Sequence, residues 1–378
     1  MTRRRVVLVT HDASLTGAPM VALLVARSLA EQGDEVTVVS RRSGPLLADF
    51  AAVAPTVPEL LYRVRRRLWE SRVLRPVAWI VDVLAATATL ARHRADLVYV
   101  NSTAASIYVH AARWLKVPVV LHVHESDANT DMFLSQARVD DLEGVELVAC
   151  SPQVERDLMA RTGRPSGGVH LLLSVPDADR LRAMACEDGG APPAGDPLMV
   201  GATGSVGHRK GTDLWLQVAR IVQASHPAHF VWVGELGDPA MAVPTPGVDF
   251  TGPTSNPYPA MAWFDIATLP SRDDPFPLVV VESMLLGKPV VAFDVGSVRD
   301  QVGEGGILVP PEDVEAFAAA VLHLLTDESA RAALGVAARE RAERLFSSTA
   351  FTHRLREILG APTGPTGQEP RIAARQAR

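Results

Sequence analysis

The first forty residues alternate between short apolar runs and a helix-like pattern, and this alternation limits the possible folds more than any other feature of the chain. Residues 5–10 form an apolar run, residues 21–32 repeat apolar side chains at helical spacing, and residues 35–40 return to a strand pattern. Gly33 ends the helix between the two runs. A strand, helix, strand unit of this kind predicts the start of an open parallel sheet.

The same alternation recurs along both halves of the chain. Further strands are predicted at residues 97–100, 119–123, 146–150, 169–172, 198–200, 230–233 and 266–269. One Gly/Pro-rich stretch, residues 187–197, divides the chain near its middle, and 378 residues are enough for two domains. The sequence therefore predicts an α/β protein with two Rossmann-like parallel-sheet domains, residues 1–188 and 189–346, and a ligand cleft between them.

Residues 269–296, LPSRDDPFPLVVVESMLLGKPVVAFDVG, combine the end of a buried strand with a helix start that suits an anion. Pro277 is predicted at the first helical position, where its missing N–H costs nothing. The amides of Leu278 and Val279 would then point out of the helix toward a ligand. A phosphate group is the natural ligand for such a helix start.

Two carboxylates, Asp274 and Glu282, belong to this stretch. Glu282 stands out because its helix is otherwise almost wholly apolar, and a buried carboxylate without a partner is costly. The vicinal hydroxyls of a ribose would satisfy it with two hydrogen bonds. A structural glutamate that caps a loop or pairs with an arginine fits the same stretch, and the residues alone leave both interpretations open.

Residues 201–213, GATGSVGHRKGTD, also allow two interpretations. Gly201, Gly204 and Gly207 after a strand imitate the turn of a nicotinamide-binding dehydrogenase or sugar epimerase. That turn is expected where the fold begins, however, and no tyrosine is followed by a lysine three or four residues later. In the competing interpretation, Arg209 and Lys210 precede a helix and clamp a diphosphate.

These two stretches resemble the donor-site signature of retaining glycosyltransferases of the GT-B fold, family 4 (glycosyl transferases group 1). That signature reads Glu, Pro, Phe, Gly, Leu, three apolar residues, Glu, Ala. Asp274 stands for the first Glu, Pro277 replaces Gly, Glu282 is the second Glu and Ser283 replaces Ala. The shorter Asp274 and the backbone donor lost at Pro277 affect the identity of the transferred sugar more than the reaction class.

The resemblance implies two facing domains with a helix at residues 347–360 that crosses back to the first, acceptor-side domain. The second domain would bind the nucleotide-sugar donor, and residues 361–378, rich in Gly, Pro and Arg, are predicted to be disordered. The implied catalytic residues are His124, Arg209, Lys210 and Asp274. The implied donor-binding residues are Gly17, Gly204, Thr251, Pro277, Leu278, Val279 and Glu282.

The implied activity is that of a retaining, metal-independent hexosyltransferase. It would move a sugar from a nucleotide diphosphate, UDP- or GDP-linked, to a hydroxyl of a saccharide, lipid-linked or small-molecule acceptor, without a cofactor. Two alternatives remain on the sequence: an NAD-dependent nucleotide-sugar epimerase or dehydrogenase built on residues 201–207, and a non-catalytic nucleotide-sugar binding protein.

Two acidic or histidine-rich clusters have weaker metal interpretations. His122 and His124, together with Glu125 and Asp127, could ligate a metal, but strand-end hydrogen bonds to loops explain the cluster better. Asp177 and Asp179 form an Asp-x-Asp, yet they stand where acids stabilise a helix start, and we favour that role. No metal site is therefore predicted.

Charge and cysteine content restrict partners and location. The net charge of -6 argues against a general nucleic-acid binder, and two cysteines are too few for a disulfide framework, so a cytoplasmic location is expected. Residues 60–75 form a basic amphipathic segment with six arginines. A solvated helix face is the simpler interpretation, and contact with anionic lipid at the inner face of the membrane is the other.

Overall fold

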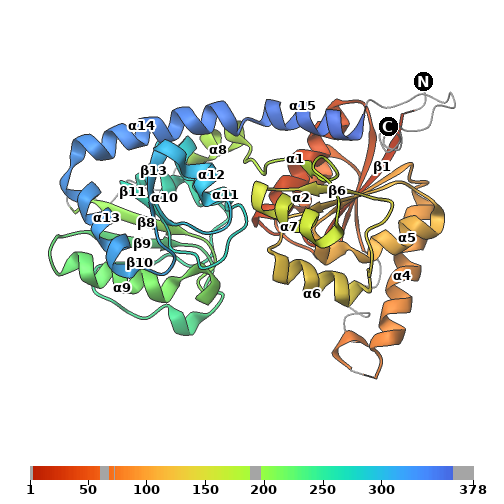
Figure 1. The fold of residues 1–378 in the computed structure, drawn as a ribbon, viewed down its shortest axis with the longest axis horizontal. Coiled ribbons are helices and arrows are strands. Elements are labelled where there is room, and N and C mark those ends of the chain that lie inside the picture. The colour runs from red at the N-terminus through yellow and green to blue at the C-terminus, as the bar shows by residue number, and fades with distance from the viewer. Residues whose placement is uncertain (1–2, 60–67, 72, 188–196, 361–378) are drawn as a thin grey trace. The chain divides into compact units, whose positions relative to one another are not determined.

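The computed structural model describes residues 3–59, 68–71, 73–187 and 197–360, which form two compact units. The first unit comprises the described residues of Met1–Leu173 and Thr349–Arg378, and the second comprises those of Ser174–Ser348 (Figure 1). Among the described residues, no helix is both long and apolar enough to cross a bilayer.

The first unit is built on a seven-stranded parallel sheet in the order β3-β2-β1-β4-β5-β6-β7. The strands are β1 (Arg5–Thr10), β2 (Glu35–Ser40), β3 (Thr56–Pro58), β4 (Leu97–Asn101), β5 (Val119–Val123), β6 (Val145–Ala149) and β7 (His170–Leu171). Strands β4 and β5 are buried along their whole length, since helices cover both faces of the sheet. The predicted parallel architecture is confirmed.

Helices connect these strands and close the first unit. They are α1 (Gly17–Glu31), α2 (Leu47–Val53), α4 (Arg75–Arg92), η1 (Thr103–Ala105), α5 (Ile107–Leu115), α6 (Asp127–Ala137), α7 (Pro152–Thr162) and α15 (Ser348–Leu359). Helix α15 belongs to this unit: Thr352 Oγ1 lies 2.8 Å from Ser28 Oγ, and Arg354 Nε donates to Leu171 O at 3.2 Å. This agrees with the last helix expected to return to the first domain.

The second unit contains a six-stranded parallel sheet in the order β10-β9-β8-β11-β12-β13. Its strands are β8 (Met199–Thr203), β9 (His229–Val233), β10 (Val248–Phe250), β11 (Ile266–Leu269), β12 (Val290–Phe293) and β13 (Gly306–Val309). Its helices are α8 (Ala178–Ala185), η2 (His208–Lys210), α9 (Thr212–Gln223), η3 (Pro239–Met241), α10 (Tyr258–Trp263), α11 (Leu278–Leu285), α12 (Val298–Val302), η4 (Gly303–Gly305), α13 (Val314–Thr326) and α14 (Glu328–Leu345).

Trp215 on α9 anchors the core of the second unit. Its ring meets Trp232 of β9 edge to face at 5.2 Å, and its Nε1 donates to Thr268 Oγ1 of β11 at 3.0 Å. Thr268 in turn donates to Gly201 O of β8 at 2.7 Å. This buried chain of contacts fixes three strands to one helix, so the loops that leave the carboxyl ends of β8 and β11 start from rigid positions.

The division between the units differs from the predicted boundary. The units divide between Leu173 and Ser174, not between residues 188 and 189, because helix α8 packs against α10 and α11 of the second unit. Asp177 is the N-cap of α8 and accepts from Arg180 N at 3.0 Å, which confirms the helix-start role for the Asp-x-Asp. Most of the Gly/Pro-rich stretch and the tail from residue 361 lie outside the described residues.

Candidate functional site

Arg272 joins the two loops in which most of the predicted site residues lie. Its guanidinium makes a two-point contact with Asp213, at 2.7 Å for each nitrogen, and donates to His208 O at 2.8 Å. Its backbone N–H donates to Arg209 O at 2.9 Å. The hydrogen bonds with Asp213 raise the pKa of Arg272 and lower that of Asp213. The sequence analysis missed Arg272, because one arginine in a polar loop carries no distinguishing signal.

Lys210, Asp274 and Arg209 form one cluster at the carboxyl ends of β8 and β11. The Lys210 ammonium donates to the Asp274 carboxylate, and the two side chains are only 16% and 10% exposed. Arg209 Nη1 donates to Asp273 O at 2.8 Å and lies 3.8 Å from Asp274 Oδ2. Three of the four predicted catalytic residues therefore meet in the second unit. Together they place two cations beside one carboxylate.

Two glycines lie against this cluster. A Cβ at Gly204 would lie 3.6 Å from Lys210 Cε, so the lysine stem runs over this glycine. Gly211 has φ +70°, and a Cβ there would lie 1.9 Å from Pro270 O. The Lys-Gly pair therefore reflects a geometric need: the residue after Lys210 must adopt a left-handed conformation against the neighbouring loop.

We expect Gly211→Ala to destabilise the second unit by several kcal/mol, because the methyl group adds a backbone collision to the conformational strain. Gly252→Ala is the matched control, since Gly252 has φ +75° and nothing within 4 Å of the added Cβ. It should cost only about 1–2 kcal/mol. Denaturant unfolding of both variants measures the difference, and equal losses would contradict the collision.

Glu282 is buried inside α11 and receives a hydrogen bond from Tyr258. The Tyr258 hydroxyl donates to Glu282 Oε1 at 3.0 Å, and the glutamate is 6% exposed. Burial raises the pKa of Glu282 to about 7, and the hydrogen bond from Tyr258 opposes this shift. The structure thus gives the acid a protein partner that the sequence analysis did not identify.

The start of α11 is held by helix α12 and by the loop between β12 and α12. Pro277 is the N-cap residue and α11 begins at Leu278, so the prediction of Pro277 as the first helical residue is wrong by one position. Its ψ of 114° is too extended for a helical residue, and Gln301 Nε2 donates to Pro277 O at 3.1 Å. A Cβ at Gly296 would lie 2.1 Å from Asp274 O, so only glycine fits there. Leu278 and Val279 supply the first amides of the helix, as predicted.

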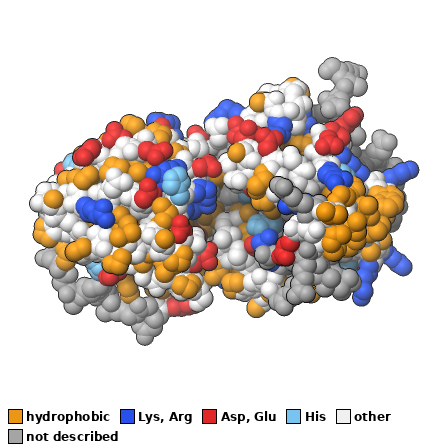
Figure 2. Space-filling model, turned by 90° about the horizontal axis from the view of Figure 1, so that it is seen from below, with side chains coloured by type: hydrophobic (Ala, Val, Ile, Leu, Met, Phe, Trp, Pro, Cys, Tyr) orange, Lys and Arg blue, Asp and Glu red, His pale blue; other side chains and the backbone are white. Residues whose placement is uncertain are grey.

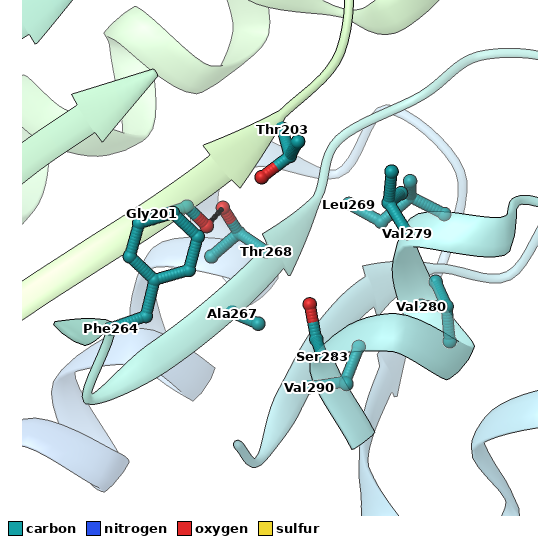
Figure 3. A pocket seen from close by; sticks show the side chains of 10 residues that line it. All are labelled: Gly201, Thr203, Phe264, Ala267, Thr268, Leu269, Val279, Val280, Ser283 and Val290. Atoms are coloured by element: carbon teal, nitrogen blue, oxygen red, sulfur yellow. Dashed lines mark hydrogen bonds between the residues drawn. The ribbon is translucent and has the colours of Figure 1, made fainter. Parts of the chain in front are cut away.

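A small recess lies beneath α11, between the helix and strands β8 and β11 (Figure 3). Thr203, Leu269, Val279 and Ser283 are among its lining residues. Figure 3 shows the Ser283 hydroxyl directed into the recess, where the family signature has a methyl group. Val279 alone belongs to the predicted site, so this recess is a packing gap beside the cluster and does not define the site.

Thr251 lies apart from the cluster, directly after β10. Its N–H donates to Trp232 O at 3.0 Å, and its hydroxyl donates to Gly252 O at 3.0 Å. The residue is exposed, and its loop leads to Tyr258 at the start of α10. The loop is therefore linked to Glu282 through one hydrogen bond from Tyr258.

The remaining two predicted residues, Gly17 and His124, belong to the first unit. Gly17 is the first residue of α1, and Asn101 at the end of β4 donates to Ala18 O at 2.9 Å. Asn101 Oδ1 then accepts from His124 Nε2 at 3.1 Å. Burial, followed by the proximity of His122 and His11, lowers the pKa of His124 well below its ordinary value, so the ring is neutral at pH 7.

Two further polar residues at this strand end, His122 and Glu125, also make hydrogen bonds. His122 Nδ1 lies 2.9 Å from the Tyr99 hydroxyl, and burial lowers the pKa of His122 to about 3. Glu125 accepts from Ser102 Oγ and from Thr103 N. In the described part of the chain, no group of three or more His, Cys, Asp or Glu side chains could hold a metal ion.

Comparisons with known proteins agree with this architecture. Residues 15–173 match the family described as Glycosyltransferase Family 4, and residues 197–327 match Glycosyl transferases group 1. Sucrose-phosphate synthase from Thermosynechococcus elongatus superposes with a TM-score of 0.74 at 20% identity, over 94% of this chain and 98% of that chain. Anabaena Alr3699/HepE in complex with UDP and glucose gives 0.74 at 18% identity, over 94% and 99%.

Curated relatives match over shorter stretches. D-inositol 3-phosphate glycosyltransferase from Nocardiopsis dassonvillei is 30% identical over 239 residues, 59% of this chain and 50% of that protein. The aligned stretches span from 14% to 50% of the lengths of the curated relatives considered.

Two parallel-sheet units that superpose on such structures define a protein of the GT-B fold. The two family matches, one in each unit, identify its family: the chain belongs to the glycosyltransferases of group 1 and family 4.

Proposed function

We propose that the protein is a glycosyltransferase that takes a sugar from a nucleotide diphosphate with retention of configuration. The observation that carries this proposal is the cluster of Arg209, Lys210 and Asp274, which lies at the carboxyl edge of one parallel sheet. Ligands of open α/β sheets bind at that edge. Two cations and the start of a helix suit a diphosphate, and a carboxylate suits the hydroxyls of a sugar.

Charge develops on the diphosphate as its bond to the sugar breaks. Lys210 is held by Asp274 and has its stem over Gly204, so its ammonium is already in place before the reaction begins. Preorganised donors of this kind are often the largest single contribution to catalysis. Glu282, oriented by Tyr258, is the proposed ribose contact, and the amides of Leu278 and Val279 are proposed phosphate contacts.

The roles of the first-unit residues are proposed from the family pattern and from their local geometry. His124 is neutral and its Nε2–H donates to Asn101, so its other ring nitrogen, Nδ1, is suited only to accept a hydrogen bond from a sugar hydroxyl. Gly17 opens α1 without a side chain, which lets a ligand approach its amide. The proposed route needs no metal and no cofactor: the acceptor attacks the face that the phosphate leaves, and the phosphate takes the proton.

The NAD-dependent alternative conflicts with the position of Gly201. This glycine lies inside β8, where a Cβ would collide with the Phe264 ring at 2.2 Å. Its role is therefore in packing, whereas the first glycine of a dinucleotide-binding turn must shape the turn itself. A non-catalytic binding protein would share the same site and is distinguished only by experiment.

A thermal-shift screen of UDP, GDP and ADP and of their sugars tests the donor. A UDP-linked sugar is the first choice, because solved structures of HepE contain UDP or UDP-glucose. The cognate ligand at one hundred times its Kd should stabilise the protein by about 2.7 kcal/mol. NMR of the transferred or hydrolysed sugar then reports its anomeric configuration. Binding without any turnover would favour the non-catalytic alternative, and an inverted product would contradict retention.

A further inference from the structure

Helix α4 of the first unit carries an apolar stripe on its outer face. Val77, Ile80 and Leu84 are 50%, 51% and 50% exposed, and their spacing places them on one side of the helix. Val73, in the turn that precedes α4, is 84% exposed, and the exposed Ala88 extends the stripe along the helix by another turn. We call Val73, Val77, Ile80, Leu84 and Ala88 the α4 stripe.

Packing within the unit does not require this stripe. The inner face of α4 is separate and consists of Ala78, Asp82, Val83, Ala86 and Leu90, all buried. Helix α14, with the same number of residues, shows what a solvated surface looks like in this chain, since its exposed residues include Glu340, Glu343 and Arg344. An apolar face of this length on an exposed helix usually marks a contact surface.

The exposed charged residues of α4 itself are both arginines, while the exposed Glu70 lies before the helix. Every exposed residue of α4 between Pro76 and Ala91 is apolar, and Arg75 and Arg92 lie at the two ends. The one acid of the helix, Asp82, is 5% exposed and accepts from Trp69 Nε1. Figure 2 shows a broad hydrophobic area with Lys and Arg side chains at its border where Figure 1 places α4.

The neighbouring helix α5 likewise has no acidic residue and has an exposed apolar side chain. It packs along α4 and carries the 62% exposed Trp114 in its last turn, followed by the exposed Lys116. Its one arginine, Arg113, pairs with the exposed Asp141. A chain with a net charge of -6 thus has two adjacent helices that carry no exposed acid of their own. The arginine-rich residues 60–67, just before α4 in the sequence, lie outside the described residues.

We propose that the α4 stripe docks on an anionic lipid bilayer surface. In the bound state, the apolar side chains of the stripe would enter the boundary between the lipid headgroups and the acyl chains. Arg75 and Arg92 would then lie at the level of the lipid phosphates. A second copy of the chain fits less well, because a twofold contact through the stripe would bring cations near cations. Docking does not depend on the proposed transferase activity. If that activity is correct, the surface would bring a lipid-linked acceptor to the enzyme.

Vesicle co-sedimentation tests the proposal on the full chain. We expect the protein to bind vesicles of phosphatidylcholine with phosphatidylglycerol, to bind phosphatidylcholine alone much more weakly, and to dissociate as salt rises. The double variant I80D/L84D should bind the anionic vesicles at least about tenfold more weakly, because each substitution puts a carboxylate in place of an inserted apolar group. Val336→Asp, at a 60% exposed valine of α14, is the matched control and should bind like the wild type.

A second variant keeps the test decisive if the double variant does not fold. Arg92→Glu changes only an exposed charge at one end of the stripe and should also weaken binding to anionic vesicles. Unchanged binding by both folded variants would overturn the proposal. A second outcome would also overturn it: the wild type self-associates, and I80D/L84D abolishes this self-association without changing vesicle binding. The stripe would then be a contact between two copies of the chain.

Discussion

Replacing Lys210 by methionine is expected to lower kcat for sugar transfer by about 10²–10³-fold, the usual effect of removing one preorganised donor to a developing oxyanion. Methionine keeps most of the stem that runs over Gly204, so the loop should stay folded. The loss would fall mainly on kcat, since the charge on the leaving diphosphate is greatest in the transition state. Steady-state kinetics with a saturating donor measure it.

Lys288→Met is the matched control for this prediction. Lys288 is also half-buried, next to a glycine and part of the second unit, but it lies after α11 and outside the cluster. Its variant should keep kcat within about threefold of the wild type, as expected for a substitution that touches no reacting group. Equal losses in the two variants would show that lysine replacement in this unit acts through folding, and the role given to Lys210 would be wrong.

The sequence predicted the architecture because both sheets are built from local signals. Short runs of valine and leucine that alternate with helical patterns predict parallel strands without any knowledge of the distant contacts. The domain boundary depends on a distant contact, the packing of α8 on α10 and α11, and was therefore misplaced.

The candidate site was predictable where a motif fixes the residues and unpredictable where a partner comes from elsewhere in the chain. Lys210 and Asp274 were both expected at the site, and the structure joins them directly. Arg272 and Tyr258 were missed, because each acts by reaching a residue on another loop or helix. A tyrosine or arginine in a polar loop gives no sign of such a contact.

Replacing Glu282 by glutamine is expected to stabilise the protein at pH 8 while weakening donor binding. The folded state raises the pKa of Glu282 from its ordinary value to about 7. Between those values the folded chain holds a proton that the unfolded chain has lost, so stability falls as pH rises and stays low above pH 7. A shift of this size corresponds to about 3 kcal/mol, which a neutral glutamine would recover.

The gain should vanish at pH 4, where Glu282 is protonated in both states, so the difference in unfolding free energy between variant and wild type must grow with pH. Glu340→Gln, at an exposed acid of α14, should show no such dependence. A Glu282→Gln variant that is no more stable than the wild type at pH 8 would show that Glu282 is ionised without penalty.

The same variant should bind the donor more weakly. Losing a charged hydrogen-bond acceptor costs about 1.5–3 kcal/mol of binding free energy, or roughly a 10- to 100-fold rise in Kd for the donor. If Glu282→Gln binds the donor as tightly as the wild type, the proposed contact between Glu282 and the ribose is wrong.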